Sequence, residues 1–410
     1  MTYAQFAAEK LGSVEIVAVA EPKREQIERL LSDKNLKDVK VFNSADELFA
    51  HPKLADGIVI ATQDRQHVGH AMAALEKGYD ILLEKPIAST LADCIKIADE
   101  ADRLGRKVMV CHVLRYTVFY QTIKKMIESG AIGDVMSIEA CEDVAYWHHA
   151  HSFVRGNWRN SETSGPMILN KCCHDMDLLS WMMNKKCKKI SSFGSNNHFN
   201  KENAPEGATE YCLGGCKVKD SCVYDCEKIY ITGKTGVRYN KSFPVHTVTA
   251  FSGPEITEED LYPALQNGPY GRCVYHCDNN VVDHQVVNAE FEDNTTASFQ
   301  MCSFTNGNRD MKVMGTKGFI YTQDFGNVVT CAKFNPLESD YECVDIRTLT
   351  DDFSGHGGGD TILFDDFINM LSIENFTSST LTSIRTSIQS HLMAFAAEES
   401  RVNGGAPIEI

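Results

Sequence analysis

The sequence lacks a long apolar run and an excess of basic charge. No hydrophobic stretch approaches the roughly 20 residues that a helix needs to cross a bilayer. The 40 lysines and arginines are outnumbered by 56 aspartates and glutamates, and the formal net charge of −16 repels nucleic-acid backbones and anionic lipid surfaces. With 410 residues, 43% of them hydrophobic, the chain has the composition of a globular protein with two domains. We therefore expect neither a membrane nor a nucleic-acid partner.

A secretory signal is also missing, because residues 1–10 contain no basic segment followed by an apolar one. The 15 cysteines are an odd number and are mostly scattered through apolar stretches such as 107–112 and 170–174. This pattern is typical of reduced thiols that pack as small hydrophobic side chains. Together, these features predict a cytoplasmic protein.

The first part of the chain alternates short β-branched runs with amphipathic helical patterns. This alternation is typical of βαβ units around a parallel sheet, so we predict a doubly wound, Rossmann-like α/β domain over residues 1–116. Longer strands separated by turn clusters then favour an α+β domain over residues 117–410, with a large, open and mostly antiparallel sheet. The strands predicted in this second domain are 135–142, 245–251, 281–291, 296–304, 310–315, 319–324 and 327–334.

Polar side chains follow three predicted strands of the first domain. Glu21 ends one strand, Thr62 and Gln63 follow another, and Glu84-Lys85-Pro86 follows a third. In open α/β sheets, ligands bind at this carboxyl edge, and an acidic residue in the position of Glu21 accepts hydrogen bonds from an adenosine ribose. Taken alone, the Glu-Lys-Pro segment would fit a solvated turn equally well, but the three strand ends together predict a nucleotide site.

Four ordered motifs resemble the Gfo/Idh/MocA oxidoreductase family, the sugar and inositol dehydrogenases that use a nicotinamide cofactor. The motifs are Ile60-Ala-Thr62-Gln63 with His67, Glu84-Lys85-Pro86, Leu114-Arg115-Tyr116, and residues 127–135. The resemblance implies that Lys85 contacts both the nicotinamide ribose and the reacting hydroxyl group, and that the bond from Lys85 to Pro86 is cis. The cofactor-binding residues that it implies are Glu21, Thr62, Gln63, His67, Glu84, Lys85 and Arg115.

A second candidate segment opens a predicted helix over residues 170–183. Asn170, His174 and Asp177 are spaced four and three apart, so they project from one helical face. The resembling family has an aspartate, a histidine and an aspartate at this spacing, lining the substrate pocket; His174 and Asp177 match, and Asn170 replaces the first aspartate. Alcohol oxidation needs a base, and neutral imidazole suits that role. We predict that these three residues and Lys85 are catalytic, with His174 as the base, Lys85 stabilising the developing alkoxide, and Asn170 bonding a substrate hydroxyl.

An aromatic and basic segment, residues 146–159, precedes this helix. Such side chains suit a polyhydroxylated ring, which has apolar faces and polar edges. Ordinary core packing stays open as the alternative for Trp158. The further candidates for substrate contact are His149, Trp158, Arg159, Lys171 and His284.

The family's glycine-rich phosphate loop is missing, since no GxGxxG occurs near the N-terminus. The acidic residue lies about 20 residues beyond those glycines, so the position of Glu21 places the loop just before Met1. We therefore expect that this sequence starts after the first strand and its loop, and that it binds dinucleotide weakly as given.

Four cysteines lie close together in a turn-rich stretch: Cys212, Cys216, Cys222 and Cys226. Four thiolates can close a tetrahedral structural zinc site. The CxxxC spacing, found twice, is wider than the usual CxxC knuckle, so free thiols and disulfides stay open as alternatives.

These predictions favour hydride transfer between NAD and a secondary alcohol of a sugar, a cyclitol or a derivative. Glu21 favours NAD because a carboxylate repels the 2′-phosphate of NADP, while Lys23 and Arg24 leave NADP open. Two alternatives remain: an NAD-dependent glycosidase that acts by transient oxidation and elimination, and a non-catalytic binding or sensor protein. The resemblance also implies a homodimer or homotetramer formed through the open sheet face.

Overall fold

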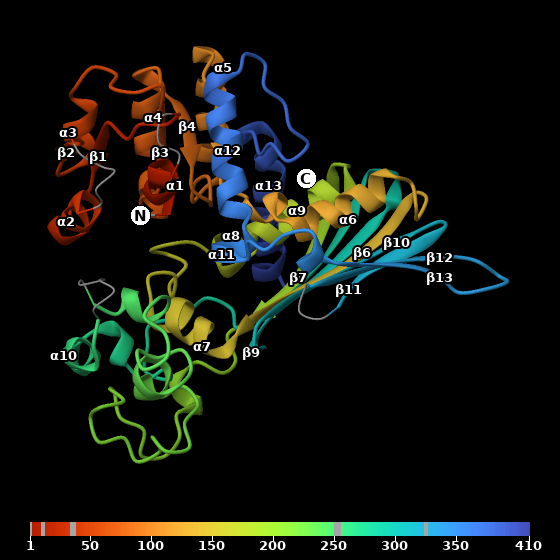
Figure 1. Ribbon diagram of the computed structural model, residues 1–410. Helices are drawn as coiled ribbons and strands as arrows, with labels where there is room; N and C mark the ends of the chain where they lie inside the picture. Colours follow the sequence, from red (N-terminus) through yellow and green to blue (C-terminus); the bar gives the residue numbers. More distant parts are fainter. Residues whose placement is uncertain (1, 10–12, 33–37, 250–255, 324–326) are drawn as a thin grey trace.

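The computed structural model describes residues 2–9, 13–32, 38–249, 256–323 and 327–410. It contains an α/β unit, a long curved sheet, and a lobe formed by residues 196–280 that lies below the α/β unit in Figure 1. Helices α12 (Gly359–Ser372) and α13 (Ile384–Val402) stand between the α/β unit and the sheet. None of the helices in these ranges is both long and apolar enough to span a membrane.

Short parallel strands alternate with helices in the α/β unit, which confirms the Rossmann-like prediction. Its elements are α1 (Thr2–Glu9), β1 (Ala18–Ala20), α2 (Arg24–Leu31), β2 (Lys40–Phe42), α3 (Ala45–Phe49), β3 (Gly57–Ile60), α4 (His67–Glu76), β4 (Asp80–Leu83), α5 (Leu91–Leu104) and β5 (Val108–Val110). The strands form two parallel sheets, β1–β2 and β3–β4–β5. Local sequence sets the ends of α5: the Thr90 side chain accepts from the Asp93 amide, and Gly105 adopts a left-handed φ of 61°.

A nine-stranded sheet dominates the rest of the chain, in the order β13–β12–β11–β10–β6–β9–β8–β7–β14. Its strands are β6 (Val135–Ala145), β7 (Cys187–Ser195), β8 (His284–Phe291), β9 (Thr296–Thr305), β10 (Asn308–Gly315), β11 (Gly318–Gln323), β12 (Val328–Lys333), β13 (Asp340–Asp345) and β14 (Ile408–Glu409). Every pairing is antiparallel except β6 with β9. Buried and exposed residues alternate along β8 and β9, so one face of the sheet is covered and the other is open.

Helices cover the inner face of this sheet and connect it to the α/β unit. They include α6 (Val118–Glu128), α8 (Met167–Asn170) and α9 (Cys173–Met183), together with α13. The single helix predicted over residues 170–183 is therefore two helices, because the chain turns at Lys171 and Cys172 between α8 and α9. Helix α13 packs on β7 and α9 on one side and on α5 and β5 on the other. It therefore holds the two parts of the molecule together.

The lobe has its own hydrophobic core, which includes Phe199, Tyr230 and Val274. The strand predicted over residues 245–251 is wrong: residues Val245–Thr247 form a 3₁₀ turn, and residues 250 and 251 lie outside the described part of the chain. Both Val245 and Val248 are buried. Residues three apart share one face of a helical turn but opposite faces of a strand, so their burial fits the turn.

Candidate active site

Lys85 connects the α/β unit to the paired helices α8 and α9. It follows β4 at the carboxyl edge of the parallel sheet, and its Nζ donates to the backbone carbonyl of Asn170 at 3.0 Å. The bond from Lys85 to Pro86 is cis, in agreement with the resemblance. The two segments that the sequence singled out therefore meet where the α/β unit contacts the helices.

Neighbouring side chains hold the backbone around Lys85. Buried His67 places its two ring nitrogens 2.8 Å from the Pro86 carbonyl oxygen and 3.1 Å from the Thr62 carbonyl oxygen. It therefore connects the ends of β3 and β4. The Tyr3 hydroxyl donates a hydrogen bond to the Glu84 carboxylate at 2.7 Å.

Three other predicted cofactor residues lie at the carboxyl ends of strands. The side chains of Thr62 and Gln63 are exposed after β3. The Glu21 carboxylate follows β1 and accepts from the Lys23 amide at 2.9 Å. These positions are those expected for residues that face a nucleotide.

Two buried polar atoms on α8 and α9 have no hydrogen-bond partner among the described residues. They are Oδ1 of Asn170 and Nδ1 of His174. The Asn170 amide group is fixed, because its Nδ2 donates to Ser164 Oγ at 3.2 Å and to the Gly165 carbonyl at 2.9 Å. Buried polar atoms are nearly always hydrogen-bonded in native proteins, so such exceptions indicate a place that a ligand or water completes.

His174 lies in a row of imidazole rings. Its ring centroid is 5.7 Å from that of His112 and 6.4 Å from that of His356, and His112 is 5.7 Å from His391. Burial lowers the pKa of His174 well below its usual value, and Lys85 and His112 lower it further. The imidazole is therefore neutral at neutral pH and able to accept a proton.

Arg115 and Asp177 form a buried ion pair behind this row. The Nε and Nη2 atoms of Arg115 each lie 2.6 Å from an oxygen of Asp177, and both side chains are nearly inaccessible. His112 Nε2 lies 4.0 Å from the same carboxylate. The pairing engages the charged groups of Arg115 and Asp177 with each other, next to the row of imidazoles.

A second buried group of charges lies on the other side of α8. Glu142 of β6 pairs with Lys171 at 3.3 Å and with Arg309 of β10, which also pairs with Asp175 at 2.9 Å. Burial raises the pKa of Asp175 to about 6. Glu142, Lys171 and Arg309 line a cavity of about 500 Å³ together with Tyr120, Trp147 and His148. That volume is typical of a small-molecule pocket.

Four of the predicted substrate residues do not line this cavity, and each is engaged by a protein group. His149 is buried and bonds Ser303 Oγ at 2.8 Å, Arg159 pairs with Asp278 at 2.9 Å, and His284 pairs with Asp283 at 2.6 Å. Trp158 Nε1 donates at 3.0 Å to Asp64, which follows Thr62 and Gln63 at the edge of the parallel sheet. Burial also lowers the pKa of His149 to about 3. Of the five candidates, the described structure brings only Lys171 to the cavity.

Sequence reasoning missed His112, Glu142, Asp175 and Arg309. His112 follows β5 at the carboxyl edge of the sheet, which is the same signal that identified Lys85. Glu142 lies in β6 and Arg309 lies in β10. The two residues are directly opposite each other in the register of this antiparallel pair. Only the tertiary pairing of these strands shows that relation.

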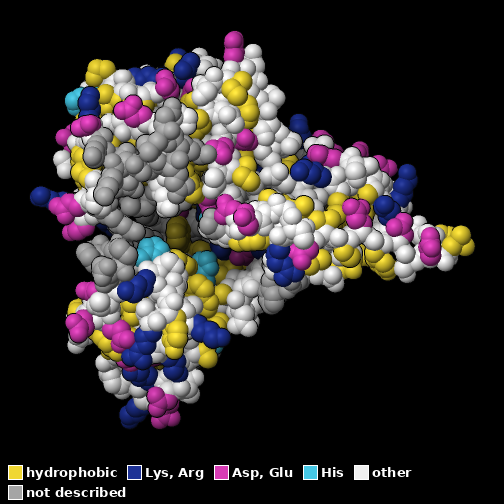
Figure 2. Space-filling view, in the orientation of Figure 1, with side chains coloured by type: hydrophobic (Ala, Val, Ile, Leu, Met, Phe, Trp, Pro, Cys, Tyr) yellow, Lys and Arg dark blue, Asp and Glu magenta, His cyan; other side chains and the backbone are white. Residues whose placement is uncertain are grey.

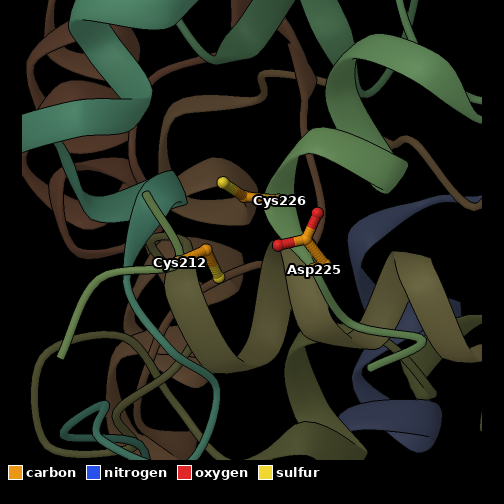
Figure 3. A group of neighbouring side chains, drawn as sticks. All are labelled: Cys212, Asp225 and Cys226. Atoms are coloured by element: carbon orange, nitrogen blue, oxygen red, sulfur yellow. The ribbon is translucent and has the colours of Figure 1, made fainter. Parts of the chain in front are cut away.

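The four-cysteine set is brought together only in part (Figure 3). Cys212 and Cys226 group with Asp225 rather than with Cys216 and Cys222, and their ligand atoms lie within 4.8 Å of one another. Cys216 follows a turn whose Gly215 has a φ of 82°, and Cys222 ends a second turn that bonds Val218. Two of the four predicted cysteines therefore belong to this group, and an aspartate joins them, while Cys216 and Cys222 line a small cavity beside it.

A parallel α/β unit joined to an open sheet, with a lysine at the sheet edge facing an asparagine and a histidine, defines an oxidoreductase with an NAD-binding Rossmann fold. A family model described as an oxidoreductase family with an NAD-binding Rossmann fold matches residues 2–112, and its C-terminal alpha/beta domain matches residues 124–410. The chain belongs to the Gfo/Idh/MocA oxidoreductase family, which confirms the resemblance.

Relatives in sequence carry oxidoreductase and dehydrogenase names. The oxidoreductase YteT of Bacillus subtilis is 24% identical over 327 residues, which cover 76% of this chain and 71% of YteT. The inositol 2-dehydrogenase of Salmonella paratyphi B is 24% identical over 187 residues, which cover 45% of this chain and 52% of the dehydrogenase. The chain thus matches about half of that enzyme.

Solved structures share the whole architecture at low sequence identity. The scyllo-inositol dehydrogenase of Lactobacillus casei, with bound NAD(H) and scyllo-inositol, aligns with a TM-score of 0.63 and 15% identity over 100% of this chain and 95% of that one. The super-repressor mutant of Gal80p from Saccharomyces cerevisiae aligns with a TM-score of 0.67 and 14% identity over 98% and 92%. These similarities show the fold, which an enzyme and a repressor share.

Proposed function

We propose that this chain is a dehydrogenase that transfers hydride between NAD and a secondary alcohol of a cyclitol, a sugar or a sugar derivative. The observation that carries the proposal is the meeting of Lys85 with Asn170 and His174 at the carboxyl edge of the parallel sheet. There, a fixed cation lies beside a buried acceptor and a buried ring nitrogen that have no partner among the described residues. The inositol dehydrogenases among the relatives support the substrate class.

The edge of the α/β unit carries residues that fit NAD. Glu21 suits the adenosine ribose, and the exposed Thr62 and Gln63 lie beside Lys85, which suits the nicotinamide ribose. A carboxylate at Glu21 repels a 2′-phosphate, which favours NAD over NADP. When bound, the nicotinamide accepts the hydride. We assign Glu84 and His67 to holding this edge, since both are engaged by protein groups.

The side chains of the site divide the remaining work. Asn170 Oδ1 accepts a hydrogen bond from a substrate hydroxyl and orients it. His174, neutral because it is buried, removes the proton of the reacting hydroxyl. The Lys85 ammonium, held by the Asn170 carbonyl, stabilises the negative charge that develops on that oxygen. Arg115 and Asp177 position His112 and α9 behind the base.

Turnover assays with a panel of inositols, other cyclitols and sugars test this function. We expect net NADH formation with at least one polyol, at higher kcat/KM with NAD than with NADP, and its loss in His174→Gln. Release of a leaving group from a glycoside with no net NADH would support an NAD-dependent glycosidase instead. A ligand-dependent thermal shift without any turnover would support a binding or sensor protein.

We also propose that the chain forms homo-oligomers through the open face of its sheet. Hydrophobic side chains gather along the arm formed by β10 to β13 (Figure 2), and Phe334, Leu337 and Tyr341 are exposed there. Exposed apolar patches of this kind mark association surfaces. Light scattering after size exclusion should give a dimer or tetramer, and Tyr341→Asp should shift it toward a monomer.

A further inference from the structure

The lobe contains a buried group of metal-ligating atoms that the proposed reaction does not use. Cys212, Asp225 and Cys226 are 8%, 1% and 0% exposed, and their ligand atoms lie within 4.8 Å of one another (Figure 3). They come from two separate segments of the lobe. Two thiols and a carboxylate that converge in the interior are ligand types that a metal ion binds.

Backbone hydrogen bonds hold both segments in place. The Cys212 amide donates to the Gly271 carbonyl at 2.9 Å. Asp225 precedes a short helix, and its Oδ1 accepts from the Lys228 amide at 3.2 Å. One carboxylate oxygen is thus engaged by the protein, which leaves the other oxygen for a ligand.

A buried cation without a carboxylate partner lies against this group. Arg155 is 0% exposed; its Nη2 donates to the Tyr224 carbonyl at 2.7 Å and lies 3.6 Å from Cys212 Sγ, and its Nε donates to the Arg272 carbonyl at 2.7 Å. Within the described ranges, Nη1 has no hydrogen-bond partner, and the guanidinium has no ion pair with a carboxylate. A buried charge of this kind needs opposite charge nearby.

The charges of this group are compatible with a divalent cation. A bound metal deprotonates both thiols, so two thiolates and the Asp225 carboxylate then carry three negative charges. The divalent cation and the Arg155 guanidinium together compensate all three. Next to it lies a cavity of about 10 Å³, lined in part by Cys212, Asp225, Cys222 and Cys273, which is the size of a single water or ion.

We propose that the lobe binds one zinc ion through the Sγ atoms of Cys212 and Cys226 and a carboxylate oxygen of Asp225. Zinc prefers tetrahedral coordination by thiolate sulfur with nitrogen or carboxylate oxygen, and soft thiolates select it over calcium or magnesium. Cys222 and Cys273 supply further sulfur atoms for the fourth position. Each coordinating thiol releases its proton as its bond to zinc forms. The site stabilises the lobe and is independent of the proposed dehydrogenase function.

Metal analysis of the full chain, purified without chelator, tests the proposal. We expect about one zinc per chain in the wild type, in line with a closed structural site, and the loss of most of it in Cys212→Ser and Cys226→Ser. Cys343→Ser is the matched control, because Cys343 is an exposed cysteine on β13, and it should keep the zinc. A wild-type protein without zinc that also gains none on dialysis against zinc would overturn the proposal.

Two further measurements keep the test valid if a serine variant fails to fold. Asp225→Asn keeps an oxygen acceptor for the Lys228 amide but removes the charge, so it should bind zinc more weakly than the wild type while keeping the wild-type circular dichroism spectrum. Cobalt replacement of the metal should give the thiolate-to-cobalt charge-transfer band. Absence of that band, or a disulfide between Cys212 and Cys226 in unreduced peptide maps, would contradict zinc coordination.

Discussion

The junction around Lys85 and the interior of the lobe handle buried charge in opposite ways. At the junction, Arg115 pairs with Asp177, and Arg309 pairs with Glu142 and Asp175; neutral side chains, those of His112, Asn170 and His174, have buried atoms without a hydrogen-bond partner among the described residues. In the described part of the lobe, the cation Arg155 has no ion pair with a carboxylate and lies beside the thiol of Cys212. The difference indicates the ligand: unpartnered neutral polar atoms suit a neutral polyol, and thiols grouped with a carboxylate suit a metal ion.

Acidification should produce the largest effect, and it acts on both regions. Burial lowers the pKa of His112 to about 4 and the pKa values of His149, His151 and His391 to about 3. The unfolded chain therefore binds more protons below its histidine pKa of about 6.5, and stability falls as the pH falls from 6.5 toward 4. Below about pH 6.5, each such histidine lowers the free energy of unfolding by about 1.4 kcal/mol for each pH unit.

For these four groups, unfolding by denaturant at pH 5.5 should give a free energy of unfolding about 5 kcal/mol lower than at pH 7.5. His149→Gln and His391→Gln, which remove one titrating group each, should have a smaller pH dependence than the wild type. A stability that is constant between these pH values would show that the four imidazoles are solvated in the native protein.

The second-largest effect should come from breaking the buried ion pair between Arg115 and Asp177 at the junction. Asp177→Ala leaves the buried Arg115 guanidinium uncompensated, and removal of one partner of a buried pair costs about 3–5 kcal/mol. The measurement is the denaturant midpoint of the variant. Replacing both partners, in Arg115→Met with Asp177→Leu, should recover much of that loss; a double variant as unstable as the single one would show that packing, rather than charge, explains the effect.

Removal of Lys85 should lower activity without lowering stability. Lys85→Ala should lower kcat. The expected loss of transition-state stabilisation is about 3–4 kcal/mol, which is typical of removing one electrostatic contact. Its thermal midpoint should stay near that of the wild type, because the side chain is only half-buried. Lys96→Ala, at an exposed position of α5, is the control. Equal loss of activity in both variants would argue against a role for Lys85 in the site.

The smallest expected effect is a shift in a pH profile. Because burial lowers the pKa of His174, kcat/KM for alcohol oxidation should be constant from pH 6.5 to neutrality and should fall only at more acidic pH, where imidazolium forms. From the sequence alone, the direction of this shift was open, since Asp175 and Asp177 oppose Lys85. An acidic limb centred at or above 6.5 would indicate a solvated or different base, with Lys171 as the first residue to replace.

Local patterns predicted the fold well where one segment carried the whole signal. The amphipathic pattern of residues 91–104, which ends at Gly105, predicts a helix, and the apolar run of residues 80–83 predicts a strand. These ranges coincide with α5 and β4. By contrast, β7 (Cys187–Ser195) was missed, because its lysines, serines and glycine do not form a β-branched run. Its pairing with β8 and its contact with α13 stabilise it as a strand.

The candidate site also has features that the sequence predicts and features that it does not. Lys85, Asn170 and His174 follow motifs with fixed spacing, and the structure brings them together. Which charges pair could not be predicted, because Arg115 meets Asp177 across 62 residues and Arg309 meets Asp175 across 134. For the cysteines, spacing suggested four equivalent ligands, whereas the group in the structure contains two of them and Asp225, which directly precedes Cys226.

Helix α13 also determines when the site can form during synthesis. The amide of Ile87, two residues after Lys85, donates to Nε2 of His391 at 2.9 Å, a contact that spans 304 residues. The segment that carries Lys85 gains this partner only after residue 391 has been made. Contacts so distant in sequence form late in folding. A nascent chain therefore cannot complete the junction around Lys85 until nearly all of its residues have been added.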